Sequence, residues 1–157
     1  MNSMMFREVN YLKLQDYISA AWRYDSKLPQ FYDKALSDKT YEQMVMNTVH
    51  KISDLYAINT ETVFYGVDID SVNSGFIVIV PKLNLLYSFG LNIKHRNAEC
   101  LKYYFRFICS KFKDYFYCLL YNHNTRAIKW LKKCGMKQDD TISTEPNIVY
   151  LKFNLCQ

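Results

Sequence analysis

The stretch that most constrains the fold covers residues 85–136, where short apolar runs alternate with segments of helical periodicity. Two short runs rich in aromatic and aliphatic side chains are typical of buried strands, and they read LLYSFGLNI and YFYCLLY. Each is followed by a longer segment with apolar residues at helical spacing, first NAECLKYYFRFICSKF and then NTRAIKWLKKCGM. A strand, a helix and a second strand in this order predict a parallel strand pair joined by a right-handed crossover.

The N-terminal half of the chain predicts a strand, two helices and a hairpin. It opens with the strand MMFREV, after which Asn10 is placed to cap a helix whose apolar residues recur at i, i+3, i+4, i+7 and i+8. Thr40 begins a second helix, because Gln43 three residues later completes a capping box. The hairpin strands read TVFYGVDI and GFIVIVP. The continuously apolar GFIVIV is typical of a central strand covered on both faces.

Local signals also indicate where the last elements begin and end. Asn97 is placed to cap the first helix of the 85–136 unit, Asn124 or Thr125 to cap the second, and Gly135 to end it in a left-handed conformation. A final strand follows from the alternation in IVYLKFN. We therefore expect an α/β (α+β) fold with the element order β-α-α-β-β-β-α-β-α-β, formed by a single domain over residues 1–157.

Composition narrows the class of protein. Hydrophobic residues make up 50% of the chain, which is typical of a globular protein and not of a disordered one. No apolar run approaches the roughly 18 residues that cross a bilayer, and the N-terminus lacks the apolar core of a signal peptide. We expect a cytoplasmic protein that is not secreted and has no membrane partner.

Cysteine, histidine and charge do not point to a metal or a nucleic acid. The five cysteines form no CxxC pair and the three histidines do not cluster, so we expect free thiols and no metal site. The net charge of +5 comes with lysine groupings at residues 111–113 and 129–137. We interpret these groupings as solvated helix faces, because no nucleic-acid recognition motif accompanies them.

The segment NTRAIKWLKKCGM carries a resemblance to a known family. It has Asn124, then Ala127 after two residues, and then Gly135 and Met136 after seven more. This pattern resembles the late helix of the GNAT family, the acyl-CoA-dependent N-acetyltransferases, and the predicted element order is similar over nearly the whole chain. The resemblance implies a mixed, mostly antiparallel sheet with a central splayed parallel strand pair, and acetyl-CoA as the cofactor.

In this family the pantetheine arm enters the cleft between the splayed strands, and the pyrophosphate sits on backbone N–H groups at the start of the next helix. A helix N-terminus favours an anion because unpaired N–H groups and the positive end of the helix dipole converge there. The cofactor-binding residues that the resemblance implies are Leu91, Ile93, Arg96, Asn97, Ala98, Asn124 and Ala127.

The chain departs from the family at two places. The phosphate-binding pattern is Gln or Arg, two residues, Gly, one residue, then Gly or Ala, and the glycines let phosphates approach the backbone. Arg96 fits, but Glu99 and Leu101 occupy the small-residue positions. A carboxylate at a helix N-terminus interacts with the dipole by about 0.3–1 kcal/mol, which opposes a phosphate there. The family's proton-donating tyrosine is replaced by Leu131.

Three residues are catalytic candidates. Tyr121 and His123 lie just before the late helix and are placed to protonate the departing thiolate, although a strand core position and a surface position are the ordinary interpretations. Asp68 is placed to act as the general base, directly or through a water. Asp70 and Glu61 lie in the same region, and all three carboxylates are otherwise explained as solubilising loop residues.

The departures favour a GNAT-fold protein with a degenerate acyl-CoA site that acts as a structural or interaction component. The alternative is an active acetyl-CoA-dependent N-acetyltransferase for an unidentified amine. The pair Trp130-Leu131 and the stretch SFGLNI also resemble GNAT-like proteins of tailed bacteriophages, which implies a virion or the host cytoplasm as the location. Fourteen tyrosines and ten phenylalanines are compatible with a protein partner or self-assembly, because aromatic side chains often anchor interfaces.

Overall fold

Seven strands form one mixed sheet in the computed structural model, which describes residues 3–25, 41–142 and 145–155. The strand order is β1-β2-β3-β4-β5-β7-β6. Within this sheet only the pair β4–β5 is parallel; the other neighbouring strands run antiparallel. The strands are β1 Met4–Val9, β2 Val63–Ile69, β3 Val72–Val80, β4 Leu85–Leu91, β5 Tyr115–Tyr121, β6 Lys137–Gln138 and β7 Ile148–Asn154.

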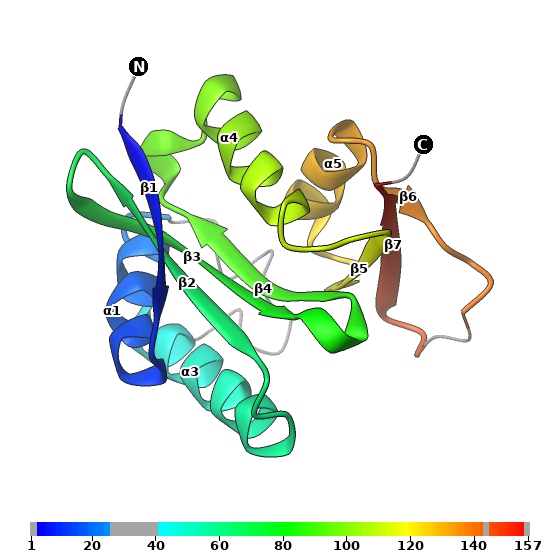
Figure 1. Cartoon of the computed structure of the whole chain (residues 1–157), viewed down its shortest axis with the longest axis horizontal. Helices are drawn as coiled ribbons and strands as arrows, with labels where there is room; N and C mark the ends of the chain where they lie inside the picture. The colour runs from blue at the N-terminus through cyan, green and yellow to red at the C-terminus, as the bar shows by residue number, and fades with distance from the viewer. Residues whose placement is uncertain (1–2, 26–40, 143–144, 156–157) are drawn as a thin grey trace.

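Helices cover both faces of the sheet (Figure 1). One face carries α1, Tyr11–Trp22, and α3, Tyr41–Ile58; the other carries α4, Ala98–Cys109, and α5, Thr125–Lys133. Two apolar cores follow from this arrangement, one under each pair of helices. In the described parts of the chain, no helix has both the length and the apolar character that a membrane span needs.

The predicted elements occur in the predicted order, with the short β6 added before the last strand, and the local signals explain them. The side chains of Asn10, Asn97 and Asn124 accept hydrogen bonds from backbone N–H groups in the first turns of α1, α4 and α5. Gly135 has a φ of 111° directly after α5, as expected for the residue that ends that helix. The predicted capping box at Thr40 lies outside the described residues.

One strand of the sheet, β6, was not predicted from the sequence, and another, β3, was. β6 pairs with β7 over only two residues, and no hydrophobic alternation marks such a short strand, so the sequence does not predict it. β3 is buried continuously over residues 74–80. This confirms the predicted central strand.

The parallel pair splays as the resemblance implies. β4 and β5 are paired at only two positions, Leu85 with Tyr117 and Leu86 with Cys118. The register between β3 and β4 shifts at the next residue of β4, so Tyr87 has no partner on β3. A bulge of this kind bends a strand. Beyond it β4 leaves β5, and the ends of the two strands are separated.

Candidate functional site

A cleft of about 710 Å³ lies where β4 and β5 separate. Residues 87–91 of β4 and 118–121 of β5 form two of its walls. Trp22 of α1 and Thr48, Lys51 and Ile52 of α3 close it on one side, and α4 and α5 close it on the other. The cleft therefore results directly from the bulge in β4, because continued pairing with β5 would fill it.

The edge of β4 brings backbone hydrogen-bonding groups to the cleft. The N–H of Asn92 donates to the carbonyl of Ser74 on β3 at 2.7 Å. Backbone groups of alternate residues point to opposite edges of a strand, so those of Phe89 and Leu91 point away from β3 and into the cleft. Ile93, the other predicted cofactor contact on this segment, is 42% exposed and is not among the residues lining the cleft.

Arg96 and Arg126 line the cleft and share one buried carboxylate. The Asp25 side chain is fully buried; its Oδ2 lies 2.8 Å from Nη2 of Arg96 and 2.7 Å from Nη2 of Arg126. Nη1 of Arg126 donates to Oδ1 of the same carboxylate at 3.3 Å, so this pair is bidentate. Nε of Arg96 donates to the carbonyl of Leu91 at 2.8 Å. Sequence reasoning missed Asp25 and Arg126, because only the fold brings them together.

The ion pairs determine the charge of this wall. Burial raises the pKa of Asp25, but the adjacent Arg126 and Arg96 guanidinium groups outweigh burial and hold that pKa below its ordinary value. Burial lowers the pKa of Arg96, which Asp25 opposes. Among the described residues, two guanidinium groups and one carboxylate meet at this wall. Arg96, predicted to attract a phosphate, is thus already engaged with a carboxylate of its own chain.

The start of α4 has some free donors. The side-chain oxygen of Asn97 accepts a hydrogen bond from the N–H of Cys100 at 2.9 Å. The backbone carbonyl of Asn97 accepts from the N–H of Leu101 at 3.0 Å. In the described residues the N–H groups of Ala98 and Glu99 have no hydrogen-bond partner. Asn97, Ala98 and Glu99 are exposed and do not line the cleft, whereas Leu101 is half-buried and does.

A second cavity of about 510 Å³, the α4–α5 groove, lies between these two helices. Leu101 and Trp130 line both cavities, so their side chains form the partition between them. The Trp130 ring reaches from α5 to β4, with its centroid 5.8 Å from that of Phe89. It also meets Phe105 of α4 edge-on at 6.0 Å.

The late-helix motif contributes two residues to the cleft. Asn124 and Ala127 both line it, whereas Leu131 is fully buried in the core under α5. The position that carries the family's tyrosine therefore packs as an apolar side chain. No group of three or more metal-ligating side chains occurs in the part of the chain that the structure describes.

The three catalytic candidates do not lie together. Tyr121 lines the cleft, and its ring stacks on that of His123 at 5.5 Å. His123 does not line the cleft; its Nε2 is buried and has no hydrogen-bond partner in the described residues. Asp68 also lies outside the cleft, where it contacts the hydroxyl of Tyr17 at 3.2 Å and Nε of Arg7 at 3.1 Å. The Asp68 side chain is buried and the Arg7 side chain is exposed, so this carboxylate links β2 to β1 and α1 at the edge of the sheet.

The two other carboxylates considered with Asp68 also lie outside the cleft. Asp70 is exposed and Glu61 forms an ion pair with Lys82 at 2.8 Å. Tyr87 is a cleft residue that the sequence did not single out. Burial raises the pKa of its hydroxyl, as do the neighbouring Tyr121 and Asp54.

Comparison with known proteins identifies the fold. No family model matches the sequence, and no curated protein matches it either. The chain is similar in structure to an acetyltransferase from Thermus thermophilus, with a TM-score of 0.70 and 12% identity over 99% of this chain and 100% of that one. It is similar to PaiA N-acetyltransferase from Thermoplasma acidophilum in complex with coenzyme A, with a TM-score of 0.64 and 17% identity over 97% and 99% of the two chains.

A third similar structure is an acetyltransferase of the GNAT family from Streptococcus pneumoniae, with a TM-score of 0.54 and 11% identity over 98% of this chain and 100% of that one. At such identities the likeness concerns the fold alone. The chain has the fold of GNAT acetyltransferases, and the mixed sheet with one splayed parallel pair that the resemblance implied is confirmed.

Proposed function

We propose that this protein uses the GNAT fold as an interaction module and that its acyl-CoA site is degenerate. The observation that carries the proposal is the wall that the Leu101 and Trp130 side chains form between the cleft and the α4–α5 groove. Leu101 occupies a position where the family pattern has Gly or Ala. Its branched side chain lines the cleft and adds bulk at a position where the family pattern leaves the backbone open to the phosphates.

The charge of the cleft wall supports the same proposal. A phosphate that recruited Arg96 would gain about 1.5–3 kcal/mol from a charged hydrogen bond. It would have to compete with the buried carboxylate of Asp25, which Arg96 contacts together with Arg126. The internal pair therefore opposes the recruitment of Arg96 by a phosphate. Glu99, exposed in the first turn of α4, adds a like charge to any phosphate placed there.

The test introduces glycine at the two positions where the family pattern has small residues. We expect the double variant Glu99→Gly/Leu101→Gly to be stabilised by acetyl-CoA in a thermal-shift titration, because ligand at about 100 times its Kd stabilises a protein by about 2.7 kcal/mol. The wild type is expected to show no saturable shift. The matched control is Ala98→Gly/Lys102→Gly, which loses similar helix propensity in the same turn without clearing either position. An equal, saturable shift in the wild type would refute the proposal.

One observation favours a second function, acetyl-CoA-dependent N-acetyl transfer to an amine. The cleft remains open, with the Leu91 N–H on one wall and the Tyr121 side chain on the other. That N–H would polarise the thioester carbonyl, and Tyr121 would protonate the departing thiolate. We would then expect thiol release with a suitable amine, reduced by about 10²-fold or more in Tyr121→Phe. Tyr150→Phe on β7, outside the cleft lining, is the matched control. Absence of thiol release across an amine panel counts against this function.

An interaction module needs a partner. We infer that the protein joins an assembly, either with a different protein or with copies of itself, and a phage particle built in a host cytoplasm is the setting that the sequence resemblance suggests. Native purification with light scattering is expected to give a stoichiometric complex or a multimer. A monomer that turns over acetyl-CoA would contradict both the assembly and the degenerate site.

A further inference from the structure

The layer of α4 and α5 carries an excess of positive charge. α4 contains Lys102, Arg106 and Glu99, and α5 contains one arginine and three lysines, so the two helices hold six cations and one anion. Arg126 is engaged with Asp25. The other five cations are all exposed, and three of them, Lys102, Arg106 and Lys133, line the cavity between α4 and α5, which lie on the same face of the sheet (Figure 1). These five are Lys102, Arg106, Lys129, Lys132 and Lys133.

The α4–α5 groove lies between these two helices and has an apolar floor. The floor consists of aliphatic, aromatic and cysteine side chains, among them Leu101, Phe105, Trp130 and Phe153. Phe105 holds the floor together, because its ring meets those of Trp130 and Phe153 edge-on at 6.0 and 5.2 Å. Aromatic packing of this kind favours a rigid surface that a partner need not order on binding.

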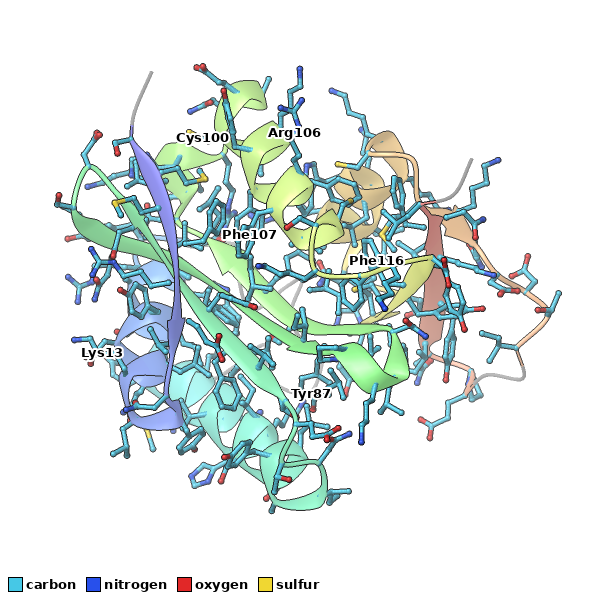
Figure 2. All side chains as sticks on the ribbon, viewed as in Figure 1. Lys13, Tyr87, Cys100, Arg106, Phe107 and Phe116 are labelled. Carbon is cyan, nitrogen blue, oxygen red and sulfur yellow. The ribbon has the colours of Figure 1, made fainter. Side chains whose placement is uncertain are left out.

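Cations form the rim of the groove. Lys102, Arg106 and Lys133 are among the lining residues, and no carboxylate is among those that the structure describes there. Figure 2 shows the Arg106 side chain projecting from α4 away from the sheet. An apolar floor with a cationic rim selects a ligand that is apolar on one side and anionic at its edges.

We propose that the α4–α5 groove docks an acidic amphipathic helix of a partner protein. This deepens the proposed function and rests on it. Apolar side chains at i, i+3, i+4 and i+7 of such a helix would cover the floor, and its carboxylates would face the three rim cations. A nucleic acid fits less well, because its phosphates would contact the rim cations but leave the apolar floor uncovered. A flat membrane surface does not enter a concave groove.

The first experiment measures fluorescence anisotropy of a labelled synthetic peptide of about 14 residues, with Leu and Phe at the four helical positions and Glu at most others. We expect saturable binding. A scrambled peptide of the same composition is expected to bind at least about tenfold more weakly, a difference of about 1.4 kcal/mol. Equal binding of the scrambled peptide, or absence of binding by both, overturns the proposal.

Charge-reversal variants test whether the peptide binds in the α4–α5 groove. Arg106→Glu and Lys133→Glu are each expected to weaken peptide binding by about tenfold. Lys13→Glu, on the opposite face of the sheet, makes the same charge change and is expected to leave binding unchanged. The groove also contains Cys109 and Cys134, so peptide is expected to slow alkylation of these two thiols, measured by mass spectrometry. Equal effects of the three substitutions, or no protection of the thiols, would exclude the groove.

Three further ligands separate the possible failures. A single-stranded oligonucleotide or anionic lipid vesicles that bind more tightly than the peptide and lose binding in Arg106→Glu would reassign the groove to another class of ligand and overturn the proposal. Acetyl-CoA is titrated against wild-type protein in the same assay. Saturable acetyl-CoA binding refutes the degenerate site, whereas failure of the peptide with no acetyl-CoA binding refutes only the assignment of the groove.

Discussion

Asp25 is the residue at which three distant segments of the chain meet. Its buried carboxylate holds Arg96, next to α4, and Arg126, in the first turn of α5. We expect Asp25→Asn to lower the free energy of unfolding by about 3 kcal/mol, because two guanidinium groups lose their shared counter-charge. Urea denaturation measures this. Asp16→Asn, whose ion pair with Lys13 is exposed, is the control and is expected to change stability by less than about 0.5 kcal/mol.

The pH dependence of this effect has a definite sign. The pKa of Asp25 is lowered in the folded protein, so its stabilising contribution is present above the ordinary carboxyl pKa and is lost as the pH falls through the folded value. The stability difference between wild type and Asp25→Asn should therefore be largest near neutral pH and shrink below about pH 4. A difference that grows on acidification would contradict the assignment.

Tyr104 joins α4 to the two central strands through its hydroxyl. The hydroxyl donates to the carbonyl of Phe76 at 2.6 Å and accepts from the N–H of Gly90 at 3.0 Å, and the side chain is buried. We expect Tyr104→Phe to cost about 1–3 kcal/mol, the penalty for unsatisfied buried groups. Thermal unfolding measures it. Tyr103→Phe, at an exposed neighbouring position, serves as the control.

Alkaline pH gives Tyr104 a second readout. Burial raises the pKa of its hydroxyl, so the wild type should lose stability relative to Tyr104→Phe as the pH rises past about 10. A constant difference up to the alkaline limit of the fold would show that the hydroxyl is not buried as described.

At the residue scale, the sequence predicted what depends on near neighbours. The caps Asn10, Asn97 and Asn124 each bind an N–H three residues away, so they are visible as local patterns. The pair of Arg126 with Asp25 spans 101 residues. No spacing rule joins such positions. For the same reason sequence reasoning placed Arg96 in a phosphate site without its carboxylate partner.

At the scale of elements, the end of α5 depends on Gly135. Its φ of 111° is a conformation that residues with a Cβ rarely adopt, and an added Cβ would lie 3.1 Å from the Phe153 ring. We expect Gly135→Ala to destabilise the protein by about 1–2 kcal/mol, measured by chemical denaturation. Ser110→Ala, at the right-handed C-cap of α4, is the control. Equal stability of Gly135→Ala and wild type would show that this helix end is not fixed by backbone strain.

Elements with strong periodicity were predictable, and short or irregular ones were not. The strand MMFREV and the helices α1, α4 and α5 follow from patterns in their own residues. The two-residue β6 has no pattern of its own, since its position depends on pairing with β7. The bulge at Tyr87 lies inside a continuous apolar run. Its consequence, the splay of β4 from β5, was expected only through the family resemblance.

At the scale of the whole molecule, the sheet and the start of α4 contrast with each other. The splay of the sheet opens a cleft, and we proposed that the wall formed by Leu101 and Trp130, the carboxylate of Glu99 and the pairing of Arg96 oppose a phosphate-bearing thioester. The basic α4–α5 layer offers a different use of the same fold. A protein built this way is expected to bind macromolecules on its helical face.

The most direct test is isothermal titration calorimetry of the purified wild-type protein with acetyl-CoA at neutral pH. We expect no saturable heat beyond that of dilution for the wild type, and a one-site curve for the Glu99→Gly/Leu101→Gly variant under the same conditions. A one-site binding curve for the wild type, lost in Arg96→Ala, would contradict the degenerate site and favour the acetyltransferase.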